Sequence, residues 1–284
     1  MNNSSRSFVS VTGISFIEFS GTEKNAFFIT LLNMGLHHRA GPPRLCQDLY
    51  TQGDVHFITN LGASGHSQQF CAIHQQGVSA IAMRVENAQD AFKTAIAAGP
   101  AAKVTNYNIP AIQGVGNSLI YLVDVELETL LFSQFSYTRQ NAVVSDTHLQ
   151  RIDHLTHNLS IGGLERMCTF YEDIFGFVRI RSFDIEGKKT GLYSEVVASP
   201  CGQVIIPLNE TKDDKSQIAE FLREYHGEGI QHIALLSSDI YSTVSQIADN
   251  GVAFQDTPDT YFERIDQRLP SHGEDVKQLG SIES

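Results

Sequence analysis

Two histidines in similar apolar segments are the residues of this sequence that could do chemistry. His232 lies within Gly229-Ile-Gln-His-Ile-Ala-Leu235, and His154 lies within Arg151-Ile-Asp-His-Leu-Thr-His157. Short apolar runs of this kind are typical of buried strands. A neutral imidazole is the commonest metal ligand, although a single strand histidine is more often an ordinary core residue. The metal-site hypothesis therefore depends on whether the fold brings the two histidines together.

Internal repeats indicate how the two segments are related. Residues 74–99 align without a gap with residues 226–251, and each stretch has a β-like run followed by a helical run that ends at a glycine. Looser copies of the same unit begin near Ile14 and Ile152. The copies lie roughly 65 to 80 residues apart, which leaves room for a strand, a helix and about three more strands. The segments that read as these further strands are 47–57, 119–124 with 130–132, 192–198 and 203–207.

The repeats predict an α+β fold of four βαβββ modules, paired into two domains. Asn87 and Asp239 are the expected N-caps of two of the helices. The helices are expected at 23–36, 88–99, 164–175 and 240–251. The expected division is into an amino-terminal module pair, a polar linker and an incomplete metal-binding domain, which are residues 8–136, 137–150 and 151–284. One further strand is expected near 252–255.

Placing the modules in register puts His232 and His154 at equivalent positions. The same position is Ala80 in the second module and falls near Ser15 in the first. A pseudo-twofold relation between paired modules brings their first strands together, so that two inward histidines can share one metal ion. His157 follows His154 by three residues and is expected to face away and to be structural. Two imidazoles with a carboxylate are typical of non-haem iron(II) oxygenases, whereas two histidines alone also suit zinc or nickel.

Composition and charge narrow the classes of partner. The net charge of -12 argues against nucleic acid and anionic membranes, because either would require a basic face. The four cysteines are scattered without a CxxC pair, which indicates reduced thiols in a cytoplasmic protein. No apolar run approaches the roughly eighteen residues of a membrane span. The sequence shows no Ser–His–Asp or Cys–His arrangement that predicts nucleophilic catalysis.

Short motifs follow one another through the carboxy-terminal half: Arg151–Asn158, Phe183–Gly187, Thr190–Ser194, Ile206–Glu210, Lys215–Ile218, Gly229–Ala234, Pro258–Tyr261 and Arg268–Pro270. In this order they resemble the bacterial 4-hydroxyphenylpyruvate dioxygenase family, with a fainter match over residues 12–136. The resemblance implies the vicinal-oxygen-chelate fold and one Fe(II) per chain. It places His154 and His232 at the positions of the two histidine ligands. The residues it implies on the substrate side are Ser194, Asn209, Gln217 and Gln231.

The resemblance also implies a reaction in which 4-hydroxyphenylpyruvate and O2 give homogentisate and CO2, in tyrosine and phenylalanine catabolism. No catalytic residue beyond the metal ligands is implied. The third ligand of the family is a glutamate on a late strand of the fourth module, and this chain ends at Ser284 before that position, as a truncated or partial sequence would. On a regular strand Gln231 is expected to point away from the side that His232 faces. Homo-oligomers are expected from the family.

Several alternatives stay open at the level of the sequence. A hydroxymandelate synthase-like oxygenase would use the same substrate and iron site, and product analysis separates the two activities. A truncated, non-catalytic binding relative would retain the modules without turnover. Another metal enzyme of the same fold, such as an extradiol dioxygenase, shares the two-histidine pattern but matches the motifs less well.

Overall fold

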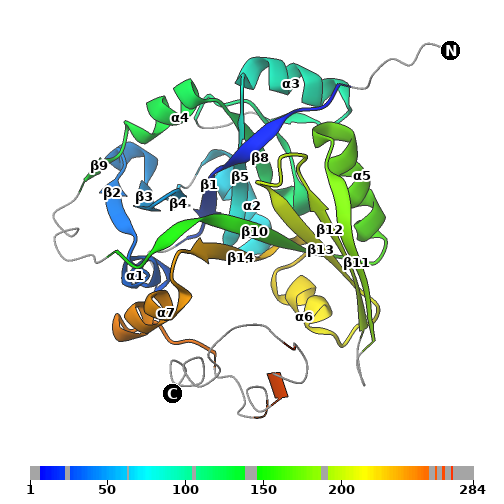
Figure 1. Ribbon diagram of the computed structural model, residues 1–284. Helices are drawn as coiled ribbons and strands as arrows, with labels where there is room; N and C mark the ends of the chain where they lie inside the picture. The colour runs from blue at the N-terminus through cyan, green and yellow to red at the C-terminus, as the bar shows by residue number, and fades with distance from the viewer. Residues whose placement is uncertain are drawn as a thin grey trace.

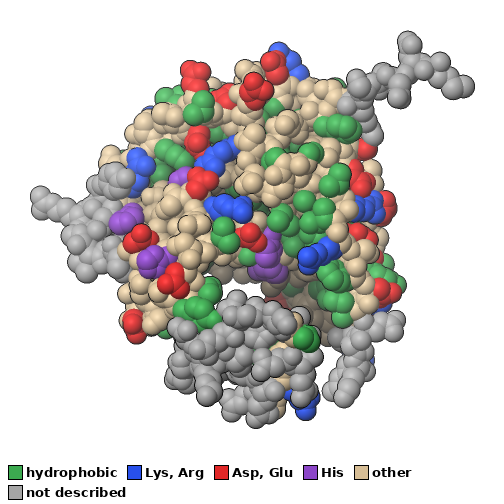
Figure 2. Space-filling view, in the orientation of Figure 1, with side chains coloured by type: hydrophobic (Ala, Val, Ile, Leu, Met, Phe, Trp, Pro, Cys, Tyr) green, Lys and Arg blue, Asp and Glu red, His purple; other side chains and the backbone are tan. Residues whose placement is uncertain are grey.

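The structure is a computed structural model of the chain. It describes residues 7–22, 26–62, 64–103, 107–137, 146–186 and 191–255, with the isolated positions 260, 264, 265 and 270. These residues form two β-sheets with helices packed around them (Figure 1). Acidic and basic side chains are interspersed over the face of the molecule shown in Figure 2. In the described part of the chain, no helix combines the length and the apolar character needed to cross a membrane.

The amino-terminal half forms the larger sheet, which has nine strands within the described residues. The central strands β1 and β5 run antiparallel, and each has a parallel neighbour on its outer side, β4 beside β1 and β8 beside β5. The spatial order is β6 (Ala102–Lys103), β7 (Ala111–Gln113), β8 (Leu119–Val123), β5 (Gly77–Val85), β1 (Val11–Ser20), β4 (Val55–Asn60), β3 (Gln47–Gln52), β2 (His37–Ala40) and β9 (Ser136–Tyr137). The helices of this half are α1 (Ala26–Asn33), α2 (Gly65–His74), α3 (Ala88–Ala97) and α4 (Val125–Phe132), with short 3-10 turns η1 (Pro43–Leu45) and η2 (Val115–Asn117).

The carboxy-terminal half forms a sheet with five strands among the described residues. Its spatial order is β11 (Val178–Glu186), β12 (Gly191–Ala198), β13 (Ile205–Thr211), β10 (Leu149–Leu159) and β14 (Gly229–Ser237). Strand β10 pairs antiparallel with β14 and parallel with β13, which repeats the arrangement of β1 with β5 and β4. The helices are α5 (Gly163–Phe175), α6 (Gln217–Glu224) and α7 (Ile240–Asp249).

The order of elements confirms the predicted modules. A strand, a helix and three more strands recur from β1 to β4, from β5 to β8 and from β10 to β13, and β14 with α7 begins a fourth copy. Asn87 and Asp239 cap α3 and α7 as expected, each accepting a hydrogen bond from a backbone N–H three residues later. Gly176 ends α5 in the left-handed conformation. The domain boundaries themselves stay a prediction, and β10 begins inside the stretch that the sequence assigned to a linker.

Two expectations about the elements are wrong, and two helices were not predicted. Residues 130–132 do not form a strand but end α4. Asp124 caps that helix, and two acidic residues in its first turn stabilise it by their favourable interaction with the helix macrodipole. Residues 252–255 do not form a strand. Helices α2 and α6 precede β5 and β14, and the sequence analysis missed both of them. Helix α6 has only eight residues, which weakens a periodic signal.

The two halves meet around His74 of α2. Its ring nitrogens lie 2.7 Å from the carbonyl oxygen of Tyr225 and 2.8 Å from that of Gly116, and its ring stacks on the Tyr225 ring. Gly116 has a positive φ of 54°, and an added Cβ there would overlap the backbone of Glu228. The contact therefore joins the turn η2 of the amino-terminal half to the chain that enters β14.

Candidate metal centre

His154 and His232 lie on adjacent central strands of the carboxy-terminal sheet. His154 is opposite Ala234, and Thr156 is opposite His232, so the two histidines are offset by two positions along the β10–β14 ladder. Their ring centroids are 5.5 Å apart, with the ring planes at 78°. The fold therefore brings together the two histidines that the sequence analysis selected.

His157 faces the other side of β10, as the strand alternation predicts. It is fully buried, and its Nε2 lies 2.8 Å from the hydroxyl of Tyr171 on α5. Burial lowers the pKa of His157 to about 3. A neutral, fully enclosed imidazole of this kind is part of the core and not of the candidate centre.

Both candidate ligands follow a β-bulge. The β10–β14 register shifts between Ile152 and His154, so Asp153 has no residue opposite it on β14. The register shifts again after Thr156, so Gln231 has no residue opposite it on β10. A bulge re-aims the side chains beside it, so residues that are neighbours in sequence can face the same side. The expectation that Gln231 points away from the side of His232 is therefore wrong: its Oε1 lies 2.6 Å from Nδ1 of His232.

Asp153 makes the equivalent contact on the other strand. Its Oδ2 lies 2.9 Å from Nδ1 of His154. A carboxylate oxygen can only accept, so Nδ1 of His154 carries the hydrogen, and in the neutral form of the ring Nε2 carries the lone pair. By the same argument, the amide oxygen of Gln231 accepts from Nδ1 of His232, so His232 has the same tautomer as His154. Nε2 of His232 lies 2.8 Å from Oγ1 of Thr156, whose hydroxyl can donate to it.

The electrostatics favour a neutral imidazole at His232. Burial lowers the pKa of His232, and the positive charge of a protonated His154 ring would lower it further. Metal binding requires the neutral form, because a protonated nitrogen has no lone pair to share. With metal–nitrogen bonds of about 2.0–2.1 Å, the rings of two ligands to one ion have centroids roughly 5 Å apart, which is close to the observed separation. The pair thus fits two nitrogen ligands of one metal ion.

The pair does not form a complete site within the described residues. No group of three or more His, Cys, Asp or Glu side chains stands close enough together there to hold a metal ion. The two acidic residues Glu274 and Glu283 near the end of the sequence lie outside the described residues.

A row of polar side chains crosses the same face of the sheet. Ser194 on β12 is opposite Asn209 on β13, and Asn209 is in register with Asn158 on β10. Asn158 is two positions beyond Thr156 and four beyond His154, so it shares their side of the strand. The structure therefore brings two of the predicted substrate-side residues, Ser194 and Asn209, onto the face of the histidines.

Asn158 is a member of this row that the sequence analysis missed. It is only 4% exposed, and its Oδ1 is a buried acceptor without a hydrogen-bond partner among the described residues. Its even spacing after His154 was the signal that could have found it. Gln217 is different: it begins α6 and its side chain is exposed, although α6 packs against β10 and β13. The structure places Gln217 beside this face without a polar contact to the row.

The amino-terminal sheet has the same backbone pattern with other side chains. Phe16 is opposite Ala82 and Glu18 is opposite Ala80, and the register shifts leave Ser15 unpaired between Ile14 and Phe16. Ala80 therefore stands where His232 does, as predicted. The counterpart of His154 is Phe16 and not Ser15, because Ser15 is the bulge residue.

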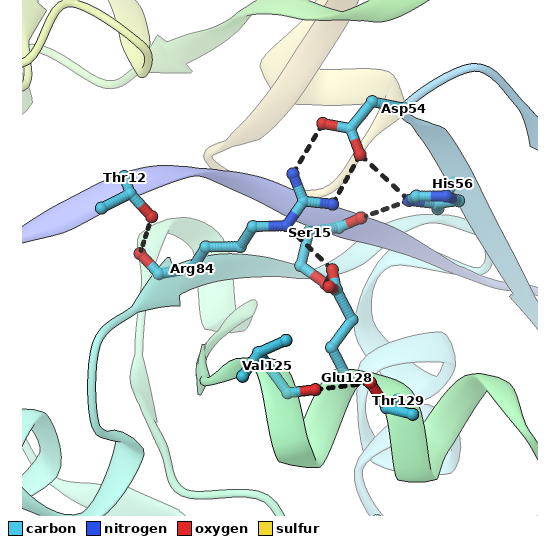
Figure 3. A network of polar contacts seen from close by, with 8 residues as sticks. All are labelled: Thr12, Ser15, Asp54, His56, Arg84, Val125, Glu128 and Thr129. Atoms are coloured by element: carbon cyan, nitrogen blue, oxygen red, sulfur yellow. Dashed lines mark hydrogen bonds and ion pairs between the residues drawn. The ribbon is translucent and has the colours of Figure 1, made fainter.

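Helix α4 closes the interior of that sheet. Ser15 donates a hydrogen bond of 2.6 Å to Glu128 of α4, and Arg84 on β5 pairs with Glu128 at 2.9 Å (Figure 3). Arg84 also makes two contacts of 2.6 Å with Asp54. Phe16 is fully buried among aromatic rings, which include Tyr121 and Phe132. The place that the histidine rings occupy in the carboxy-terminal sheet is therefore filled by packed side chains in the amino-terminal sheet.

Comparison with known proteins gives the family. Residues 6–132 match the family model described as "Hydroxyphenylpyruvate dioxygenase, HPPD, N-terminal", and residues 151–264 match that of the "Glyoxalase/Bleomycin resistance protein/Dioxygenase superfamily". A 4-hydroxyphenylpyruvate dioxygenase of Legionella pneumophila (strain Corby) is 44% identical over 271 residues, which cover 94% of this chain and 77% of the relative. The chain belongs to the 4-hydroxyphenylpyruvate dioxygenase family. It is thus an oxidoreductase of the dioxygenase type, from a family that uses a metal and a small-molecule substrate with O2.

Solved structures agree with this assignment. A fusion of a xylose isomerase-like TIM barrel with a 4-hydroxyphenylpyruvate dioxygenase superposes with a TM-score of 0.80 at 26% identity, covering 98% of this chain and 44% of the fusion. A mutant of 4-hydroxymandelate synthase from Streptomyces coelicolor superposes with a TM-score of 0.79 at 22% identity, covering 96% of this chain and 83% of the synthase. The second comparison shows the shared fold alone. Together they support the vicinal-oxygen-chelate architecture that the motifs predict.

Proposed function

We propose that this chain binds Fe(II) through His154 and His232 and serves the conversion of 4-hydroxyphenylpyruvate and O2 to homogentisate and CO2. The observation that carries the proposal is the pairing of two imidazoles, 5.5 Å apart, on the face that also bears the polar row. The family membership supplies the reaction class. The position of the histidines at equivalent points of two modules agrees with a shared ion.

The residues on this face have distinct tasks in the proposal. His154 and His232 present Nε2 atoms to the ion. Fe(II), when bound, would supply the Lewis-acid and redox chemistry of an oxidative decarboxylation of the 2-oxo acid. Ser194, Asn209 and Gln231 offer hydroxyl and amide groups, which can orient a carboxylate and a phenol by hydrogen bonds without adding charge.

The test combines metal binding and turnover. The chain is loaded with Fe(II) under anaerobic conditions, and oxygen uptake is followed after addition of 4-hydroxyphenylpyruvate. His154→Ala and His232→Ala are each expected to abolish stoichiometric iron binding. His226→Asn is the matched control, because it removes a histidine next to β14 at a position with a φ of 60°, which asparagine tolerates. Iron binding that survives both alanine substitutions would contradict the ligand assignment.

The products separate the proposed reaction from its alternatives. Homogentisate supports the dioxygenase reaction, whereas 4-hydroxymandelate would replace it by the synthase reaction on the same substrate. Stoichiometric iron without oxygen uptake would favour a non-catalytic binding relative. A cytoplasmic location and a homo-oligomeric state remain predictions from the sequence and the family.

A further inference from the structure

The two β-bulges in the β10–β14 pair have a feature that the proposed function does not require. Each bulge places one extra residue directly before a candidate ligand, Asp153 before His154 and Gln231 before His232. Each extra residue directs a side-chain oxygen to Nδ1 of the histidine that follows it, at 2.9 Å and 2.6 Å. The same contact therefore occurs twice, once on each strand of the pair.

We propose that Asp153 and Gln231 are positioning residues, which fix both histidines in the Nδ1–H tautomer and turn both Nε2 atoms toward one metal ion. The inference rests on the proposed function, because it assigns a purpose to residues around the same candidate site. Nothing in the proposal requires Asp153 or Gln231 to touch the metal. Their action is through the histidine rings.

The bulges are necessary for this arrangement. On a regular strand, consecutive side chains point to opposite faces of the sheet, so residue i−1 cannot reach the ring of residue i on the other face. An extra, unpaired residue bends the strand locally and re-aims its side chain. A metal-bound imidazole commonly donates its other N–H to a carboxylate or carbonyl oxygen, which fixes the tautomer and the ring plane. Here the bulge lets the preceding residue supply that oxygen.

The amino-terminal sheet separates the role of the backbone from the role of the side chains. It has a bulge at each equivalent place, but the extra residues are Ser15 and Ser79. Ser15 bonds to Glu128 of α4, and Ser79 bonds to the backbone oxygen of Glu18. The residues that follow them are Phe16 and Ala80, which have no ring nitrogen to orient. The bulge is thus common to both sheets, and the oxygen acceptors coincide with the histidines.

The two acceptors are not chemically equal. Asp153 is a carboxylate, and Gln231 is a neutral amide. A hydrogen bond to an ionised acceptor is roughly twice as strong as one between neutral groups. We therefore expect the tautomer of His154 to be fixed more firmly than that of His232, and removal of Asp153 to have the larger effect on metal affinity.

The first measurement determines the tautomers of the histidine rings in the metal-free protein. Nitrogen-15 NMR of the histidines in the metal-free protein at about pH 8, above the usual imidazole pKa, should show one tautomer with hydrogen on Nδ1 for His154. Asp153→Ala should convert that signal to a mixture with the Nε2–H tautomer and leave the tautomer of His232 unchanged. Asp153→Glu keeps a carboxylate, which can only accept a hydrogen bond, and should restore the wild-type spectrum.

The second readout is Co(II) binding, followed by its visible absorption spectrum. Asp153→Ala should raise the Co(II) dissociation constant about 10-fold to 100-fold, by analogy with other removed partners of ligating histidines. Asp153→Glu should recover most of the lost affinity. Gln150→Ala is the matched control, because Gln150 is also an unpaired residue of β10 and is not followed by a histidine. It should change neither the histidine signals nor the affinity.

The outcomes distinguish the two levels of the proposal. If Asp153→Ala leaves the His154 tautomer and the Co(II) affinity unchanged, the positioning role is overturned while the metal site stands. If the wild-type chain binds no Co(II), the proposed function is contradicted, and Asp153 and Gln231 then have no metal toward which to orient the histidines. A shifted tautomer together with weakened affinity, both restored by Asp153→Glu, supports the inference.

Discussion

Phe16 on β1 occupies the register position that His154 occupies on β10. Phe16 is opposite Ala82 and His154 is opposite Ala234, with a bulge residue directly before each of them. The environment is nevertheless reversed: Phe16 is fully buried, whereas the side chain of His154 is 29% exposed. The same backbone arrangement therefore holds a packed core residue in the amino-terminal sheet and a partly exposed polar residue in the carboxy-terminal sheet.

This contrast predicts very different costs for the same truncation. Phe16→Ala removes a fully buried ring and should lower the free energy of unfolding by about 3–5 kcal/mol. His154→Ala removes a partly exposed side chain and should lower it by less than about 1 kcal/mol in the absence of metal. Urea denaturation of the two metal-free variants measures the difference. Equal losses would show that His154 is a core residue.

Thr156 competes for the nitrogen that a metal would use. Its hydroxyl lies 2.8 Å from Nε2 of His232. Thr156→Val keeps the shape of this buried side chain and removes a hydrogen bond of about 0.5–1.5 kcal/mol, so Co(II) affinity should rise by roughly 2-fold to 10-fold. Titration of Co(II) into both proteins checks this expectation. Weaker binding by the variant would mean that the hydroxyl supports the metal-bound state.

His157 makes the stability of the chain depend on pH. Its pKa in the folded state is lowered to about 3 because burial disfavours the charged ring, while the unfolded ring titrates near 6.5. Between these values the unfolded chain binds a proton that the folded chain excludes, so stability decreases as the pH falls below about 6.5. At pH 5 this single group should cost about 2 kcal/mol.

The measurement compares wild type with His157→Gln, which can still hydrogen-bond to Tyr171 but does not titrate. Urea unfolding at pH 7 and pH 5 should show a smaller loss of stability for the variant than for wild type. Other groups titrate equally in both proteins, so their contributions cancel in the comparison. An identical pH dependence would mean that His157 is protonated in the folded chain.

Gly116 tests the contact between the two halves. Gly116→Ala adds a Cβ that overlaps the backbone of Glu228, in a conformation with positive φ. Gly202→Ala is the matched control, because Gly202 also has a positive φ but has open space around it. The control should cost about 1–2 kcal/mol from the left-handed backbone alone. Gly116→Ala should cost at least about 2 kcal/mol more, measured by thermal or urea unfolding. Similar losses would show that the halves separate easily at this point.

The sequence predicted the modules and the histidine pair, because both depend on local patterns. The gap-free match of residues 74–99 with 226–251 has its structural counterpart in β5 with α3 and β14 with α7. The expected caps follow the same logic, since a cap is read from a few adjacent residues. Periodicity and capping were therefore sufficient for the architecture.

The bulges could not be predicted in this way. A bulge exists only where two strands pair, and β10 and β14 are separated by about 70 residues of intervening chain. Strict alternation consequently placed Gln231 on the wrong side. The alignment of the modules put the counterpart of His154 near Ser15, and the bulge moves it by one residue to Phe16. The apolar run at 130–132 was ambiguous for a related reason: three apolar residues fit either a strand or a helix, and only the preceding cap decides.

The shared bulges also bear on how such a chain can diverge after an internal duplication. The backbone frame is the same in both sheets, and the difference at its centre is confined to a few side chains, with Phe16 and Ala80 on one side and His154 and His232 on the other. The amino-terminal sheet can accordingly specialise in stability while the carboxy-terminal sheet retains the polar face with the histidines. Phe16 packs in a cluster of buried residues that all belong to the amino-terminal half, so the demand for packing and the demand for an accessible polar face fall on separate halves of one polypeptide.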